Sequence, residues 1–229
     1  MLRYLRSLGP LLVVLCLGLA SANAETEVNW QRGLVIAKGA AVGDLRSPSR
    51  QLARVKAERQ AKRRCKAILL ESLSSIRRAS GKKIGSQKQE ALDGLAALIF
   101  PLTTDYGTDG SVVVQMALPL DALRAQLFAP DQPIAKESPG PAALIIDARS
   151  LSMSPGVGTV LGDGKTKYRG PTLFFRSEEE ARADPRVGKE AILLSAKRKR
   201  GEVLVLEPNA LAEELAARPL VAILWKGKS

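Results

Sequence analysis

The sequence predicts an α+β protein with two small α+β domains, each with helices packed on a mainly antiparallel sheet. Three observations lead to this prediction. Short apolar, β-branched runs alternate with helical patterns along the chain. Turns of the Asp-Gly type join neighbouring runs, which favours hairpins. The proline-rich stretch 129–141 has the composition of a linker, so the expected domains are 25–128 and 142–229.

Residues 1–24 have the layout of a secretory signal peptide. Arg3 and Arg6 precede an apolar run, Leu8 to Leu19, and a small-residue site follows at 22–24. The apolar run is shorter than the ~20 residues that a membrane-spanning helix needs. We therefore expect a cleaved signal, export by the general secretory route and a location in the periplasm, the cell envelope or outside the cell; a retained anchor is the alternative.

Charge and composition restrict the function. The 229-residue chain has a formal net charge of +12 and no histidine; without residues 1–24 it keeps 205 residues, a charge of +10 and one cysteine, Cys65. These counts exclude Ser-His-Asp and Cys-His nucleophiles, histidine metal ligands and an internal disulfide in the exported chain. We expect no cofactor and no metal. A basic exported protein is expected to bind polyanions other than nucleic acid, although such charge also serves solubility alone.

The N-terminal half should begin with a β-branched strand from Val28 to Val42. Ser47 and Pro48 are typical of a helix N-cap and first helical position, and no helix breaker follows before Gly81, so a helix from Ser47 to Ser80 is expected. The further elements expected in this half are a short helix at 87–97, strands at 98–106 and 111–118 joined by a turn at 107–110, and a helix at 119–127.

The long helix should pack by a face of small side chains. On a helical wheel this face contains Ala57, Ala61, Cys65, Ile68, Leu69, Ser72 and Ile76. Alanines at successive turns allow a backbone to approach closely, so we expect the helix to lie on a sheet. Cys65 lies in the middle of this face, which predicts a buried small hydrophobe; a reactive thiol is the alternative.

The opposite face of the same helix is strongly basic. Eight basic residues and one acid, Glu58, lie between Arg50 and Lys66, which gives +7 over 17 residues. An inert helix face would mix signs for i,i+4 pairs, so a docking surface for an anionic partner is favoured over a merely solvated face. The candidate binding residues are Lys56, Arg59, Lys62, Arg63 and Lys66.

The C-terminal half should contain further hairpins and helices. The elements expected here are a buried strand at 142–147, a hairpin turning at Asp163-Gly164, a strand at 172–176, a helix that begins at Ser177, a hairpin of 191–199 with 202–206, a helix at 208–217 and a strand at 219–225.

A second basic patch consists of Lys197, Arg198, Lys199 and Arg200. By pattern alone it resembles a nuclear-localisation or nucleic-acid segment. Export argues against that function, and no aromatic side chains interleave with the patch to stack on bases. We expect it to keep an edge strand soluble; a second contact with a polyanion is the alternative.

Acid pairs offer the remaining route to catalysis. Asp105 with Asp109, or Asp147 with Asp163, could serve glycoside hydrolysis. Asp109 and Asp163 have plainer roles in turns, and aromatic residues, which sugar clefts use, make up only 4% of the chain. An envelope hydrolase that uses a carboxylate pair including Asp147 is therefore the alternative function. Asp147 is also expected to form a local ion pair with Arg149.

Three segments carry a family resemblance: Val-Asn-Trp-Gln-Arg-Gly-Leu-Val-Ile-Ala-Lys-Gly at 28–39, the alanine-rich helix at 57–71, and Leu-Ile-Ile-Asp-Ala-Arg at 144–149. They resemble exported bacterial proteins related to the twenty-kilodalton outer-membrane lipoprotein family and the N-terminal domain of the flagellar H-ring assembly protein. The resemblance implies helices on a small sheet, an envelope location and a non-catalytic role in surface assembly or flagella-linked structures.

The chain departs from that family at identifiable positions. The family usually has an acid where this chain has Arg64 and an arginine where it has Ala67, and many members carry a lipid-modified cysteine that is absent here. The high positive charge could replace such a tether electrostatically. We therefore expect a non-catalytic envelope protein for binding or assembly, which contacts an envelope protein assembly or an anionic polymer or lipid through its basic helix.

Overall fold

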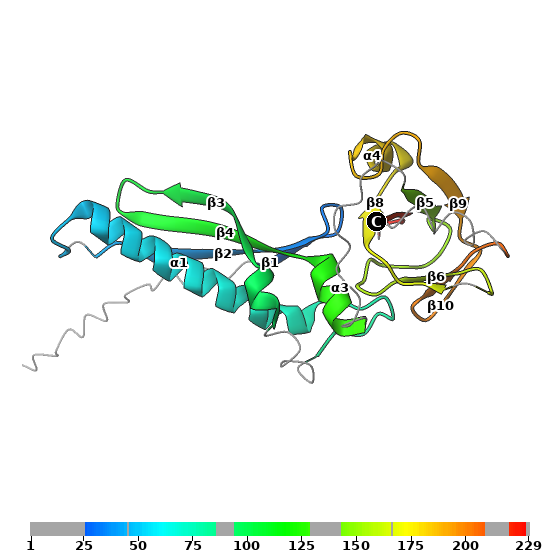
Figure 1. Cartoon of the computed structure of the whole chain (residues 1–229), viewed down its shortest axis with the longest axis horizontal. Coiled ribbons are helices and arrows are strands. Elements are labelled where there is room, and N and C mark those ends of the chain that lie inside the picture. The colour runs from blue at the N-terminus through cyan, green and yellow to red at the C-terminus, as the bar shows by residue number, and fades with distance from the viewer. Residues whose placement is uncertain are drawn as a thin grey trace, which may run out of the picture.

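The computed structural model describes residues 26–44, 46–85, 94–128, 143–165, 167–208 and 220–227. The predicted signal segment and linker, and most of the helices predicted at 87–97 and 208–217, lie outside these residues. The described chain combines helices with three four-stranded sheets (Figure 1), which confirms the α+β class. The division into two domains stays a prediction.

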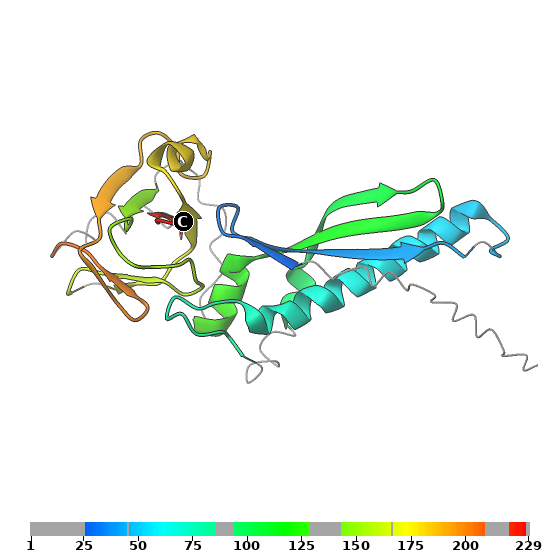
Figure 2. The same ribbon diagram turned by 180° about the vertical axis from the view of Figure 1, so that it is seen from behind.

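The N-terminal sheet is entirely antiparallel. Its order is β1-β2-β4-β3, with β1 at Thr26–Asn29, β2 at Leu34–Val42, β4 at Ser111–Pro119 and β3 at Phe100–Tyr106. The helix α1 extends along one face of this sheet (Figures 1 and 2). The N-terminal part also contains the 3₁₀ turns η1 (Leu73–Ser75) and η3 (Gly94–Leu98) and the helix α3 (Leu120–Phe128). The predicted β3–β4 hairpin and the helix after it are confirmed.

The prediction of one strand from Val28 to Val42 is wrong. The chain forms two antiparallel strands, β1 and β2, joined by a turn. Asn29 Oδ1 accepts a hydrogen bond from the backbone N–H of Arg32 at 2.8 Å, and Gly33 has a φ of 69°, which favours glycine. These local bonds reverse the chain in the middle of the apolar run.

The helix α1 extends from Arg50 to Ser72, so both predicted ends were wrong. Its N-cap is Ser49, not Ser47: Ser49 Oγ accepts from the backbone N–H of Leu52 at 3.2 Å. At the C-terminal end, the hydroxyls of Ser72 and Ser75 donate to backbone carbonyls three residues earlier, each at 2.7 Å. Such serine bonds compete with the helical pattern, and the chain becomes extended at Ile76 without any glycine or proline.

The small-residue face of α1 is confirmed. Ala53, Ala57, Ala61, Cys65 and Leu69 are buried against the sheet. The approach is closest at Gly39 of β2, where an added Cβ would lie 2.6 Å from the Ala61 carbonyl oxygen. Cys65 is fully buried, its Sγ lies 3.1 Å from the Ala37 carbonyl oxygen, and burial raises the pKa of its thiol. It is therefore packed as a small hydrophobe.

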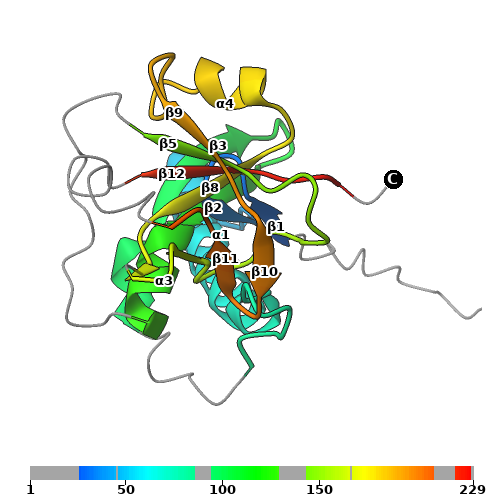
Figure 3. The ribbon, with the colours of Figure 1, turned by 90° about the vertical axis from the view of Figure 1, so that its right-hand side faces the viewer.

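The C-terminal part contains a parallel sheet, which corrects the expectation of mainly antiparallel pairing there. The order is β8-β12-β5-β9 (Figure 3), with β8 at Thr172–Phe175, β12 at Val221–Leu224, β5 at Leu144–Asp147 and β9 at Ile192–Ser195. The two central strands are buried on both faces except at Asp147, as is usual in parallel sheets. After β8, Ser177 caps the helix α4 (Glu178–Ala183), as predicted.

A second C-terminal sheet has mixed pairing. Its order is β10-β11-β6-β7, with β10 at Arg198–Arg200, β11 at Val203–Val205, β6 at Val160–Gly162 and β7 at Lys167–Tyr168. The hairpins at Asp163-Gly164 and Arg200-Gly201 are confirmed. The predicted continuous strand 191–199 is wrong, because β9 joins the parallel sheet whereas β10 joins the mixed sheet.

The N-terminal and C-terminal parts are joined by a cluster around Arg78. Its guanidinium donates to Glu202 at 2.8 Å and lies 5.0 Å from the ring centre of Phe128. Arg169 covers the same ring at 4.6 Å and contacts the second Glu202 oxygen at 3.3 Å. Backbone bonds from Val157 to the 77–79 segment continue this junction.

The β1–β2 turn forms a second contact between these parts. The Trp30 ring packs edge-on against Phe174 at 5.7 Å, and the Trp30 carbonyl accepts from the Phe174 backbone N–H at 3.1 Å. Arg186 also donates to the carbonyls of Arg32 and Gln31, at 2.9 and 3.0 Å. The turn that sequence reasoning missed therefore connects the N-terminal sheet with the C-terminal part.

Candidate anion-binding surfaces

Four of the five predicted binding residues line one groove, which we call the α1–β3 groove. They are Arg59, Lys62, Arg63 and Lys66. The groove encloses about 580 Å³, and its remaining lining is apolar: Ile99, Pro101 and Met116. Because Pro101 belongs to the edge strand β3, the groove lies where the helix meets the edge of the N-terminal sheet. A cationic rim over an apolar floor suits a partner with both anionic and apolar groups.

The charges of this groove are mostly uncompensated. Lys62 pairs with Glu58 at 2.5 Å, and Glu58 also accepts from the Tyr106 hydroxyl at 2.9 Å. The hydrogen bond from Lys62, together with that from Tyr106, lowers the pKa of Glu58. Within the described residues, Arg59, Arg63 and Lys66 form no ion pair. The electrostatic field of the groove therefore comes mainly from these three cations.

The fifth predicted residue, Lys56, does not line the groove. It is exposed on α1 about one turn before Arg59. Two other cations of the run have internal roles: Arg54 lies over the Tyr106 ring at 5.2 Å, and Arg64 donates to the Ala40 carbonyl at 2.9 Å. The basic run is therefore divided between a groove and its surroundings.

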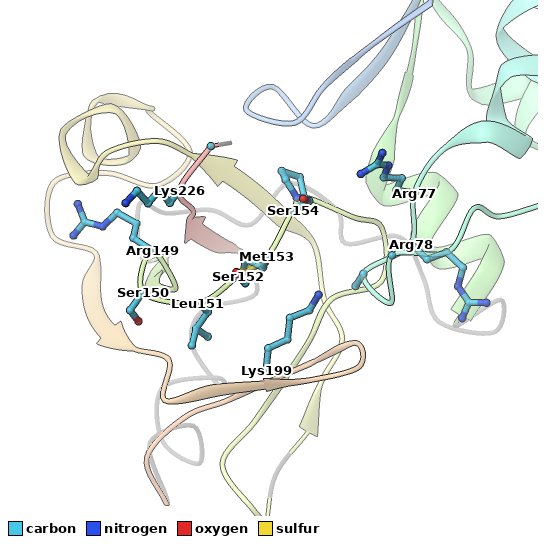
Figure 4. A pocket seen from close by; sticks show the side chains of 14 residues that line it. Arg77, Arg78, Arg149, Ser150, Leu151, Ser152, Met153, Ser154, Lys199 and Lys226 are labelled. Atoms are coloured by element: carbon cyan, nitrogen blue, oxygen red, sulfur yellow. The ribbon is translucent and has the colours of Figure 1, made fainter. Parts of the chain in front are cut away.

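A second basic concavity is one that sequence reasoning did not predict, and we call it the junction cleft. It encloses about 600 Å³ (Figure 4). Its lining contains five cations and no acid: Arg77, Arg78, Arg149, Lys199 and Lys226. The 77–81 segment contributes from the N-terminal part, and the loop 149–155, β10 and the segment after β12 contribute from the C-terminal part. The cleft thus lies where the two parts meet.

Only two of these cations are compensated by acids. Arg78 is bound to Glu202, and Arg149 forms a two-point contact with Asp147, with distances of 3.0 and 2.6 Å. In Figure 4 the side chains of Arg77 and Arg78 leave their segment in opposite directions. In the described part of the chain, no ion pair involves Arg77, Lys199 or Lys226.

The second predicted patch, residues 197–200, is divided by the pleat of β10. Lys199 lines the junction cleft, whereas Arg198 and Arg200 line a separate concavity of about 290 Å³ with Lys167. Lys197 pairs with Glu207 at 2.6 Å. As β10 is an edge strand, the location predicted for the patch is confirmed, but its four residues do not form one surface.

Three of the four acids that could have served a hydrolase, Asp147, Asp163 and Asp109, are engaged in local contacts. The hydrogen bond from Arg149 lowers the pKa of Asp147 against the opposing effect of burial, which confirms the predicted ion pair and disfavours a protonated acid. Asp163 is buried and accepts from the Lys165 backbone N–H at 3.0 Å, and Asp109 caps its own turn. In the described ranges, no three Cys, Asp or Glu side chains are grouped so that they could hold a metal ion.

Sequence reasoning missed Arg77 and Lys226 as site residues. One signal was available: Arg149 comes three residues after the apolar run that ends at Ile146, and Lys226 directly follows the apolar run that ends at Trp225. Parallel pairing of those runs would have placed the two cations at the same edge of the sheet. The expectation of mainly antiparallel sheets concealed this proximity.

Comparison with known proteins gives no family assignment. The chain matches no protein-family model, and no curated protein matches it significantly. Among the described residues, no helix is both long and apolar enough to span a bilayer.

Proposed function

We propose that this protein is a non-catalytic binding protein of the cell envelope that attaches to an anionic lipid surface through the α1–β3 groove. The resemblance of segments 28–39, 57–71 and 144–149 to exported envelope proteins is the basis for proposing a place in the outer membrane or in flagella-linked assemblies. The carrying observation is the groove itself, in which three cations without an ion pair among the described residues surround an apolar floor. An anionic polymer or an acidic protein face is the competing partner.

The charge pattern of α1 supports binding over a purely structural role. Its first turn contains no acid and its last turn no base, so its charges do not complement the helix dipole. Among the described residues, only one ion pair, Lys62 with Glu58, lies within the helix. Cations near an acidic membrane contribute about 1 kcal/mol each, and salt weakens this attraction. These charges therefore favour binding of α1 to a negatively charged surface.

Sedimentation with lipid vesicles tests this proposal. We expect the chain to pellet with vesicles rich in an acidic phospholipid, but not with zwitterionic vesicles, and to be released by high salt. The variant with Arg63→Glu and Lys66→Glu should lose most of this retention. The matched control, Arg50→Glu with Lys56→Glu, makes the same charge change on α1 outside the groove and should retain more.

Several outcomes would count against the proposal. Equal losses in the two double variants would assign retention to overall charge and not to the groove. Salt-dependent retention on cell-wall sacculi but not on vesicles would favour the polymer as partner. If neither material nor an envelope extract retains the protein, the proposed binding function is wrong.

A further inference from the structure

We propose that the junction cleft is a second anion site, which binds a ligand bearing a diphosphate or two neighbouring phosphate groups. Lys199 would bind the phosphate oxygens, and Arg77 and Lys226 would add to the positive field of the cleft. The cleft shares no lining residue with the α1–β3 groove, so the two proposals are independent.

The first argument is the position of the cleft relative to the parallel sheet. Asp147, at the end of β5, is paired with Leu224, at the end of β12. Arg149 and Lys226 each come two residues after one of these strand ends, and both line the cleft. The carboxyl ends of parallel strands form the usual ligand-binding edge of open α/β sheets. The cleft therefore lies at the edge where such sheets bind ligands.

The second argument is the excess of positive charge. Five cations line the cleft, and among the described residues only Glu202 and Asp147 compensate two of them. Cations that share a concave surface repel one another, and an anion bound between them removes that repulsion. A single carboxylate would neutralise one positive charge, whereas a diphosphate supplies enough charge for all three remaining cations.

The third argument is the chemistry and size of the lining. Ser150, Ser152 and Ser154 also line the cleft, and their hydroxyls can donate hydrogen bonds to phosphate oxygens. A volume of about 600 Å³ is within the range of organic-ligand pockets. Leu151 and Met153 add apolar surface, so a ligand larger than inorganic diphosphate would also find contacts for its organic part.

The fourth argument is that the chain fixes Arg77 at the cleft. Backbone bridges join Arg77 to Lys83 and Arg78 to Val157. The Arg78 side chain is held by Glu202 and Phe128, on the side away from Arg77 (Figure 4). Contacts that do not involve the ligand thus already fix the backbone of Arg77, so less conformational entropy is lost when a ligand binds.

Calorimetric titration of the whole chain with pyrophosphate and with inorganic phosphate tests this site at physiological salt. We expect pyrophosphate to bind at least about tenfold more tightly than phosphate. Lys199→Ala should weaken pyrophosphate binding about tenfold, the usual effect of losing a charge-assisted contact. Arg198→Ala is the matched control: it removes one charge from the same strand on the opposite face, and it should change the affinity less than twofold.

Three results would overturn the site: no pyrophosphate binding, equal affinity for both anions, or equal weakening by Lys199→Ala and Arg198→Ala. Thermal melting of each variant ensures that a loss of affinity is not a loss of fold. Vesicles that carry a diphosphate headgroup identify the source of the ligand, provided that the Arg63→Glu, Lys66→Glu variant is used so that the groove does not contribute. Retention that an added Lys199→Ala abolishes assigns a lipid, and binding of soluble pyrophosphate alone assigns a free ligand. The Arg63→Glu, Lys66→Glu variant should keep its pyrophosphate affinity, which separates this test from that of the groove.

Discussion

Gly39 is the residue that sets the distance between α1 and the N-terminal sheet. An added Cβ would lie 2.6 Å from the Ala61 carbonyl oxygen and 2.7 Å from Cys65 Cβ, in both cases closer than atoms pack. We expect Gly39→Ala to lower the free energy of unfolding by about 1–3 kcal/mol, because the helix must shift. Urea denaturation measures this. At Gly94 an added Cβ meets no atom within 4 Å. Gly94→Ala should therefore change the free energy of unfolding by less than about 0.5 kcal/mol, as is usual for substitutions that disturb no packing.

The carboxyl group of Asp147 should titrate below its ordinary pKa of 3.8, because Arg149 donates hydrogen bonds to its charged form. A lowered folded-state pKa contributes stability above pH 3.8 that is lost as the pH falls through the folded value. NMR titration of the carboxyl carbon checks the first point. Arg149→Ala should raise the midpoint towards 3.8 and reduce the acid sensitivity of unfolding; an unchanged midpoint would show that this pair does not set the pKa.

At the scale of the elements, the start of α1 distinguishes the two serines before it. Ser49→Ala should cost about 1 kcal/mol of stability, since it removes the acceptor for the Leu52 N–H. Ser47 Oγ is buried with no hydrogen-bond partner among the described residues, so Ser47→Ala should be neutral or stabilising. Thermal and chemical denaturation of the two variants measure the difference. A larger loss of stability in Ser47→Ala than in Ser49→Ala would show that Ser47 is the N-cap, as the sequence suggested.

Elements whose signals are local could be predicted from the sequence, and those that depend on distant partners could not. The turns at Asp163-Gly164 and Arg200-Gly201 specify hairpins through their own backbone preferences, and both hairpins form. An apolar run such as Leu144–Asp147 predicts a strand but does not specify its neighbours. The parallel partners of β5 come from residues 192–195 and 221–224, and only the folded chain shows that pairing.

The candidate sites follow the same division. The α1–β3 groove was partly predictable because its cations share one helix face, which periodicity specifies. The apolar floor below them, Pro101 and Met116, comes from other elements and was not foreseen. The junction cleft combines residues 77–81 with residues beyond 149, so no local pattern indicates it. Within residues 197–200, the alternation of side chains along β10 directs Lys199 to one surface and Arg198 and Arg200 to another, although the sequence shows only one run of charges.

At the scale of the whole molecule, the two candidate anion-binding surfaces have different characters. The α1–β3 groove lies at a sheet edge with an apolar floor, which suits an extended surface such as a membrane. The junction cleft lies between the N-terminal and C-terminal parts and depends on both of them. Contacts that hold these parts together therefore also shape the cleft. A variant that loosens the junction should affect pyrophosphate binding and stability together while leaving the groove intact.

Glu202 is the residue that tests this dependence. It is the shared partner of Arg78 and Arg169, and its side chain is only 18% exposed. Glu202→Gln leaves two cations beside Phe128 without an acid, so we expect the free energy of unfolding to fall by about 1–3 kcal/mol. Glu207→Gln breaks an exposed pair with Lys197 and should cost less than about 1 kcal/mol. Chemical denaturation measures both variants. Equal effects would show that the Glu202 cluster does not hold the two parts together, whereas a larger loss of stability at Glu202 is the result that the junction predicts.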